Sequence, residues 1–192
     1  PLPADPMPLA STWFRQAWDE QVQPNPNAMS LATTDADGKP SVRIMLCKEI
    51  VADPGYLLFY TNYGSRKGQE LGAQPWAAVV FHWDALGRQL RIEGLVVHAL
   101  ASESDDYFAS RPWRSRLAAI TSEQSAPIAS RQLLLERLRT TAERLGTPES
   151  LVVPTGMAAR GRGIETWKGA AKESTVYEIL DRGSDFDRAR IS

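Results

Sequence analysis

The chain has 192 residues, which is long enough for one domain with a sizeable core, and its 22 Lys and Arg nearly balance its 23 Asp and Glu. This balance excludes binding to nucleic acid or to a membrane surface through bulk charge, so any anion site must be a local cluster of cations. The single Cys47 excludes an intrachain disulfide, the two His residues argue against a metal site, and no apolar run approaches a membrane span, so we expect a cytoplasmic protein.

The first half of the chain predicts one helix and then a series of strands. Residues 4–22 are expected to be helical, with Asp5 as the cap, and residues 28–50 form a hairpin around Asp37-Gly38. Further strands are expected at 55–61, 76–83 and 88–100, with a short helix at 65–74. Consecutive strands at this short spacing favour an antiparallel sheet that closes into a small barrel.

The second half changes character. Ser102 is expected to cap a helix that Pro112 interrupts, and residues 125–146 have the pattern of an amphipathic helix. Short strands are expected at 164–169 and 174–180, after a segment that resembles a loop. We therefore expect one α+β domain, divided into an N-terminal helix (1–25), a barrel core (26–100), a helical segment (101–147) and a C-terminal segment (148–192).

The stretch "YTNYGSRKGQEL", from Tyr60 to Leu71, places hydroxyl residues and two cations where a strand leads into a helix. The free N–H groups of the helix start, the charges of Arg66 and Lys67, and the hydroxyls of Thr61 and Ser65 together suit a phosphate group. The same residues also fit a solvated turn with a serine cap, so the pattern leaves both interpretations open.

Other candidate residues are less distinctive. Gln89 lies between two arginines on a strand, where its amide suits either the edge of a heterocycle or solvent. Arg43 and Lys48 are five positions apart, so an ideal strand would direct them to opposite faces unless it is bulged. No arrangement of Ser, Cys and His supports a side-chain nucleophile, so an enzyme of this sequence would depend on a bound cofactor.

The order of these segments resembles the pyridoxamine 5'-phosphate oxidase family, whose members are FMN-binding split barrels. The resemblance extends from about Asp5 to Arg131 and includes "LATTDADGKPSVRIMLCK", "FYTNYGSRKGQEL", "FHWDALGRQLRIEG", "YFASRP" and "SEQS". It implies an antiparallel six-stranded Greek-key split barrel with peripheral helices. It also implies a homodimer, because such barrels build the flavin site between two subunits.

The resemblance assigns roles to particular positions. It implies that FMN contacts Arg43, Ile44, Met45, Leu46, Cys47, Lys48, Tyr60, Thr61, Ser65, Arg66, Lys67, Gln89, Gln124, Ser125 and Trp167. Gln89 would come from the second subunit. The substrate phosphate would be held by Lys48, Tyr107, Arg111 and Ser115.

The C-terminal segment departs from the family pattern. The family places an Arg-x-His pair and a further Arg after the strand that contains Trp167, and at direct spacing these positions hold Glu173, Thr175 and Tyr177. With four residues inserted, Arg182 matches the last arginine, but Glu178 and Leu180 replace the pair. Arg116 and Ile120 also stand where the family tends to carry Gln and Trp.

The expected activity is FMN-dependent oxidation of pyridoxamine or pyridoxine 5'-phosphate to pyridoxal 5'-phosphate, with oxygen as acceptor and hydrogen peroxide as product. The altered C-terminal segment leaves two alternatives open. The protein would then be a relative that oxidises a different substrate, such as a phenazine precursor, or one that binds FMN or pyridoxal phosphate with little turnover.

Overall fold

The computed structural model describes residues 4–146, 164–169 and 175–181. Helix α1 (Met7–Asp19) precedes the strands β1 (Ala28–Thr34), β2 (Pro40–Val51) and β3 (Tyr56–Asn62). Helix α2 (Arg66–Ala73) follows, and then β4 (Trp76–Trp83), the short 3-10 helix η1 (Asp84–Leu86) and β5 (Arg88–His98). Three helices and two strands complete the order: α3 (Ala101–Ser110), α4 (Trp113–Thr121), α5 (Arg131–Leu145), β6 (Ile164–Gly169) and β7 (Thr175–Asp181).

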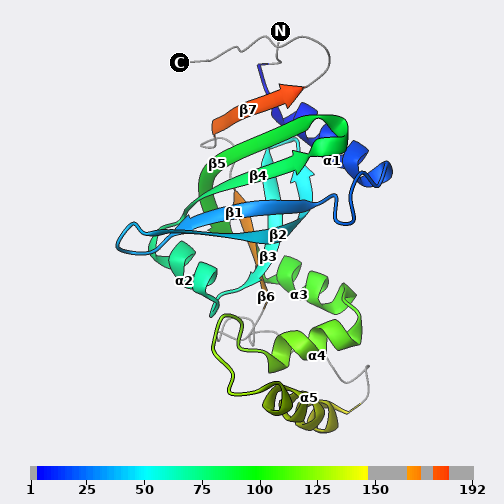
Figure 1. The fold of residues 1–192 in the computed structure, drawn as a ribbon, viewed down its shortest axis with the longest axis vertical. Helices are drawn as coiled ribbons and strands as arrows, with labels where there is room; N and C mark the ends of the chain where they lie inside the picture. The colour runs from blue at the N-terminus through cyan, green and yellow to red at the C-terminus, as the bar shows by residue number, and fades with distance from the viewer. Residues whose placement is uncertain (1–3, 147–163, 170–174, 182–192) are drawn as a thin grey trace.

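The strands form an antiparallel barrel. The sheet runs in the order β4-β1-β2-β3-β6-β5-β7, and β4 also pairs with β5, so six strands form a closed circuit of pairings. The expected six-stranded split barrel is thus confirmed, and β7 is a seventh strand added to β5. One edge of β5 is shared, because Arg88–Glu93 pairs with β7 while Val96–His98 pairs with β6. Figure 1 shows the curled sheet with α1 on one side and α3, α4 and α5 stacked below it.

The core lies inside this sheet and under α1. Phe81 and Trp83 of β4 are fully buried and stack on one another, and Phe14 of α1 packs edge-on against Phe81. The indole N–H of Trp83 donates to the Pro26 carbonyl oxygen at 2.7 Å, so its one polar atom is satisfied. Arg88 ties β5 to α1, because its guanidinium lies over the Trp13 ring.

Most of the expected elements form, and three of the predicted boundaries were wrong. Helix α5 begins at Arg131 rather than at 125, because Ser125 has a positive φ of 71° and Ser130 is the residue whose hydroxyl caps the helix. Helix α3 begins at Ala101, so Ser102 lies inside it, and Glu103 accepts from the Leu100 N–H instead. Helix α1 is shorter than 4–22, although Asp5 does accept from the Met7 N–H as a cap would.

The β1–β2 hairpin turns where the sequence predicted. Asp35 accepts from the backbone N–H groups of Asp37 and Lys39, and Gly38 adopts a φ of +80° that favours glycine. The register of this hairpin places Thr33 opposite Ser41 and Leu31 opposite Arg43. Two polar residues of β2 are thereby brought beside a polar residue of β1, next to α2.

Replacing Trp83 with Phe is expected to lower the free energy of unfolding by about 2 kcal/mol, because it leaves a cavity and an unpaired Pro26 carbonyl. Urea denaturation followed by circular dichroism measures this change. Trp76→Phe is the matched control, since Trp76 is 52% exposed and should change stability by less than about 0.5 kcal/mol. Equal effects of the two substitutions would contradict the proposed role of Trp83.

Candidate functional site

The start of α2 places a group of polar side chains beside the ends of β1, β2 and β3. Ser65 is extended, with φ −71° and ψ 159°, and its hydroxyl caps the helix by accepting from the Gly68 N–H at 3.3 Å. The expected serine cap is therefore present, and Ser65 is fully buried. The residues that follow, Arg66 and Lys67, stand in the first turn of the helix, where free N–H groups favour an anion.

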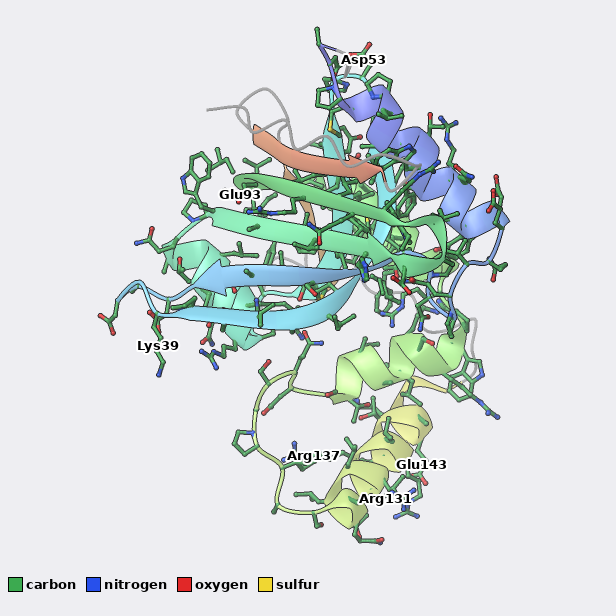
Figure 2. The ribbon with its side chains drawn as sticks, turned by 45° about the horizontal axis from the view of Figure 1, so that its top comes forward. Lys39, Asp53, Glu93, Arg131, Arg137 and Glu143 are labelled. Atoms are coloured by element: carbon green, nitrogen blue, oxygen red, sulfur yellow. The ribbon has the colours of Figure 1, made fainter. Side chains whose placement is uncertain are left out.

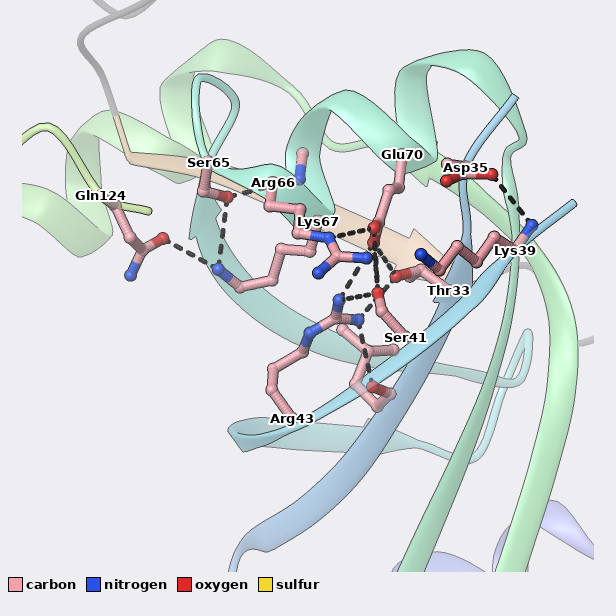
Figure 3. Close-up of polar contacts among 12 residues, drawn as sticks. Thr33, Asp35, Lys39, Ser41, Arg43, Ser65, Arg66, Lys67, Glu70 and Gln124 are labelled. Atoms are coloured by element: carbon pink, nitrogen blue, oxygen red, sulfur yellow. Dashed lines mark hydrogen bonds and ion pairs between the residues drawn. The ribbon is translucent and has the colours of Figure 1, made fainter. Parts of the chain in front are cut away.

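Glu70 lies at the centre of the group, and its carboxylate is only 4% exposed (Figure 3). Its Oε1 accepts from Arg66 Nε at 2.8 Å, and its Oε2 accepts from Arg43 at 3.0 Å. The hydroxyls of Thr33 and Ser41 also donate to it. Burial by itself raises the pKa of Glu70, but these hydrogen bonds outweigh it and lower the pKa to about 2.

Arg43 is committed to this network. One terminal nitrogen donates to the Leu31 carbonyl at 3.1 Å and to the Thr33 hydroxyl at 2.6 Å, and the other donates to Ser41 and Glu70. Arg66 differs, because its side chain is 58% exposed and only its Nε is bonded to Glu70 among the described residues. Of the two arginines, Arg66 is the one whose terminal amino groups bond no described residue.

Lys67 is the most buried cation of the group, at 6% exposed. Its ammonium donates to the Ser65 hydroxyl at 3.2 Å and to Gln124 Oε1 at 2.9 Å, and no carboxylate of a described residue pairs with it. Burial, and after it the charge of Arg43, lowers the pKa of Lys67 to about 8, although Glu70 acts in the opposite direction. Thr61, the next-to-last residue of the nearby strand β3, has a buried hydroxyl with no partner among the described residues.

A second group of candidate residues meets on Tyr107 of α3. Tyr60 of β3 stacks on the Tyr107 ring, with centroids 3.5 Å apart and planes 6° apart. Two cations approach the same ring, Lys48 at 5.4 Å and Arg111 at 5.9 Å from its centroid. Lys48 reaches it from a bulge, because the β2–β3 register shifts between Cys47 and Glu49.

A cavity of about 460 Å³ lies between α1 and the bulged end of β2. Phe14 and Trp18 of α1 line it, together with Lys48 and Glu49. This volume is within the range that small-molecule sites occupy. The Lys48 side chain therefore belongs both to the wall of this cavity and to the surroundings of the Tyr107 ring.

The structure does not bring all the residues of β2 to one place. Arg43 faces Glu70 and Lys48 faces Tyr107, as expected for opposite faces of a strand. Ile44 and Leu46 are 66% and 40% exposed on the outer face, and Met45 packs against the core. Cys47 is fully buried, and burial raises its pKa to about 12, which keeps the thiol protonated.

The remaining candidates are placed less directly. Gln89 is half-buried in β5 opposite His82 of β4, and Ser125 adjoins Gln124 with its left-handed backbone. Ser115 lies in the first turn of α4, where its N–H donates to the Pro112 carbonyl. The backbone of Trp167 pairs with Phe59 of β3. Glu173 and Arg182 lie outside the described residues, whereas Glu178 and Leu180 are strand positions opposite Arg91 and Gln89.

The sequence analysis missed three members of the first group: Glu70, Thr33 and Ser41. The spacing of Arg66 and Glu70, which is i to i+4 on a helix, was a signal for their ion pair. The pairing of Thr33 with Ser41 depends on the hairpin register, which the turn at Asp37-Gly38 could have fixed. That these hydroxyls meet Glu70 depends on how α2 packs on the hairpin, which no local pattern encodes.

The described residues contain neither a membrane-spanning helix nor a cluster of metal-binding side chains. Among residues 4–146, 164–169 and 175–181, no helix is long and apolar enough to cross a membrane. Within the same ranges, no group of three or more His, Cys, Asp or Glu side chains is placed to hold a metal ion.

Solved structures share the fold. PhzG from Burkholderia lata, in complex with tetrahydrophenazine-1-carboxylic acid, superposes with a TM-score of 0.77 at 26% identity, covering 95% of this chain and 82% of PhzG. A pyridoxamine 5'-phosphate oxidase-related, FMN-binding protein from Nostoc punctiforme has a TM-score of 0.63 at 15% identity, covering 96% of this chain and 94% of its own. The second likeness concerns the fold alone.

Sequence comparison gives the family. The family model described as pyridoxamine 5'-phosphate oxidase matches residues 14–144. Proteins named pyridoxine/pyridoxamine 5'-phosphate oxidase are similar over most of the chain. That of Gloeothece citriformis is 46% identical, covering 86% of this chain and 78% of its own, and that of Paraburkholderia phymatum is 51% identical, covering 92% and 82%. The chain therefore belongs to the pyridoxamine 5'-phosphate oxidase family.

Proposed function

We propose that the protein is an FMN-dependent oxidoreductase that converts pyridoxamine or pyridoxine 5'-phosphate into pyridoxal 5'-phosphate. The observation that carries the proposal is Lys67, a buried ammonium at the N-terminus of α2 that no carboxylate of the described residues neutralises. A buried cation without a paired carboxylate favours an anionic ligand, and the relatives named as oxidases indicate the kind of ligand to expect.

The residues at the start of α2 fit the phosphate of FMN. Lys67 and the terminal nitrogens of Arg66 supply charge, and the buried Thr61 hydroxyl has an unused hydrogen-bonding capacity. Ser65 accepts from both Lys67 and the helix N–H, so it orders the turn around the ligand. Gln124 holds Lys67 from the opposite side and would keep its ammonium directed at the phosphate.

The second group fits an anionic, ring-shaped substrate. Lys48 and Arg111 supply two positive charges, and Tyr60 and Tyr107 supply flat surfaces against which a pyridine ring can lie. A separate phosphate site for cofactor and for substrate accounts for two local clusters of cations in a chain of net charge −1. Tyr60 and Thr61 are neighbours in β3, so this one strand serves both groups.

In the proposed reaction, bound FMN supplies the acceptor for a hydride from the substrate carbon that bears the amine or alcohol, and oxygen takes up the electrons to give hydrogen peroxide. The chain itself positions the reactants and compensates their charges. Lys67 and Arg66 would hold one phosphate, and Lys48 and Arg111 the other. Cys47, buried and protonated, takes no part as a nucleophile.

A second candidate function is oxidation of a different anionic ring compound. The observation that favours it is the likeness to PhzG, whose structure holds a tricyclic carboxylic acid. The missing Arg and His of the C-terminal segment would also remove part of a vitamin phosphate site. The cations around Tyr107 suit a carboxylate as well as a phosphate, so only turnover distinguishes the two functions.

We also propose that the protein acts as a homodimer joined through the outer face of β2. Val42, Ile44 and Leu46 are 68%, 66% and 40% exposed and alternate with the inward-facing residues of that strand. Ala32 and Ser30 of β1 lie beside them in register. An apolar stripe of this kind on a sheet face marks an interaction surface, and a second barrel would cover it.

The function is tested by titrating the purified protein with FMN and then measuring oxygen uptake. We expect flavin fluorescence to be quenched on binding, and oxygen to be consumed with pyridoxamine or pyridoxine 5'-phosphate. Tricyclic amines and carboxylates serve as the competing substrates. Activity with these and none with the vitamin phosphates would favour the second candidate, and absence of any flavin binding would contradict both.

FMN affinity is expected to fall as the pH rises above about 8, the pKa of Lys67 without ligand. A phosphate dianion stabilises the charged ammonium and raises this pKa, so binding takes up a proton once Lys67 is neutral in the free protein. The dissociation constant should be nearly constant between pH 7 and pH 7.5, as rough bounds, and then rise by up to roughly tenfold per pH unit. Lys67→Met should bind more weakly and lose this dependence, whereas a wild-type affinity that stays flat to about pH 9 would exclude Lys67 as the phosphate ligand.

Ile44→Asp is expected to convert the dimer into a monomer, because it buries a carboxylate in the proposed interface. The mass measured by light scattering coupled to size-exclusion chromatography should fall from about twice the chain mass of 21.2 kDa to about that mass. Leu135→Asp is the control, since Leu135 is a similarly exposed apolar residue on α5, at 43%. A wild-type protein that is already monomeric at micromolar concentration would refute the interface.

A further inference from the structure

The ion pair between Arg66 and Glu70 differs from an ordinary pair on a helix surface. Arg139 and Glu143 of α5 have the same i to i+4 spacing, but their atoms are 3.7 Å apart and their side chains are 73% and 64% exposed. Glu70, by contrast, is buried and bonds Arg66 at 2.8 Å. Exposed pairs contribute little because both side chains remain mobile, whereas a buried acceptor can fix its partner. Figure 2 labels Glu143 on α5, well away from the barrel.

Glu70 is itself immobilised by the β1–β2 hairpin. The hydroxyls of Thr33 and Ser41 donate to it, and Arg43 adds a charged hydrogen bond at 3.0 Å (Figure 3). These partners come from two strands that are paired in register, so the sheet holds the Glu70 carboxylate in place. On the other side, the carboxylate bonds Arg66 of the helix. Glu70 therefore fixes the Arg66 side chain relative to the barrel and not only relative to its own helix.

The four charged residues of the group have different partners. Arg43 gives its terminal nitrogens to protein acceptors, so it balances the charge of Glu70 inside the fold. Lys67 and Arg66 are then left as the net positive charge toward the first turn of α2. A carboxylate can lie close to an anion site under these conditions, because its own charge is already compensated.

We propose that Glu70 is a positioning residue for the FMN phosphate: it binds Arg66 through Nε and thereby presents the two terminal amino groups to the ligand. This inference rests on the proposed function, and it assigns a role to a residue that does not itself touch the ligand. A guanidinium has donors on more than one edge, so it can bind a carboxylate and a phosphate at once. A lysine at this position has a single nitrogen, so it could not present two amino groups to the phosphate while it binds Glu70.

The test compares FMN with riboflavin, which lacks the phosphate, for the wild type, Glu70→Met and Glu70→Gln. The measured quantity is the ratio of the riboflavin dissociation constant to the FMN dissociation constant, which isolates the contribution of the phosphate. We expect Glu70→Met to lower this ratio by about tenfold, because Arg66 loses its anchor. Glu70→Gln keeps an oxygen for Arg66 Nε and should leave the ratio within about threefold of the wild-type value.

Two further variants complete the design. Glu143→Gln removes the exposed pair on α5 and should leave both dissociation constants unchanged. Arg66→Lys keeps the charge at a 58% exposed position, so it should fold even if Glu70→Met does not. We expect it to lower the ratio about as much as Glu70→Met does, since one ammonium cannot hold Glu70 in the same way and bind phosphate.

The outcomes separate the two hypotheses. If the wild type prefers FMN over riboflavin but neither Glu70→Met nor Arg66→Lys changes the ratio, Glu70 has no positioning role and the proposed function stands. If Glu70→Met weakens both flavins equally, its role is structural and the inference is again wrong. A wild type that binds both flavins alike would overturn the phosphate site itself, and with it this inference and the proposed function.

Discussion

The requirement that a buried charge be paired organises this structure. Glu70 is taken out of water at the point where α2 packs on the β1–β2 hairpin, and an isolated carboxylate there would be strongly destabilising. Two arginines and two hydroxyls satisfy it: Thr33, Ser41 and Arg43 come from the hairpin, and Arg66 comes from the helix itself. The network therefore forms only when the hairpin and the helix have both reached their native positions. A low pKa for Glu70 is the expected result, because its partners stabilise the charged form.

The closed circuit of strands makes that arrangement possible. Because β1 pairs with β4 and β2 pairs with β3, the hairpin cannot separate from the rest of the barrel without breaking two ladders. Strand β3 leaves this circuit directly into the turn that Ser65 caps, so the first turn of α2 is held at the end of a barrel strand. Rigid support of this kind suits the function proposed above, in which the chain positions two reactants and supplies no nucleophile.

The sequence carried much of this information, but not all of it. The strands, the hairpin turn and the serine cap were predictable because each depends on a local pattern: alternation, an Asp-Gly pair, and a hydroxyl before a helix. The start of α5 was not, because the apolar pattern continues upstream of Ser130 although Ser125 has a left-handed backbone. The cations of "SRK" were identified as candidates, but which of them bonds the protein and which keeps donors for a ligand depends on Glu70. The contacts of Glu70 with the hairpin come from the packing of α2, which sequence spacing alone does not predict.

The same reasoning explains why the two cation clusters remain distinct in a chain of nearly zero net charge. Adjacent residues of a strand point to opposite faces, so Tyr60 and Thr61 serve different groups although they are covalently linked neighbours. Likewise Arg43 and Lys48 of β2 diverge, one toward Glu70 and the other, from the bulge, toward Tyr107. The two clusters of like charge are thus kept on separate sides of the sheet edge. The cations of a single pooled cluster would repel one another more strongly than those of two separated clusters do.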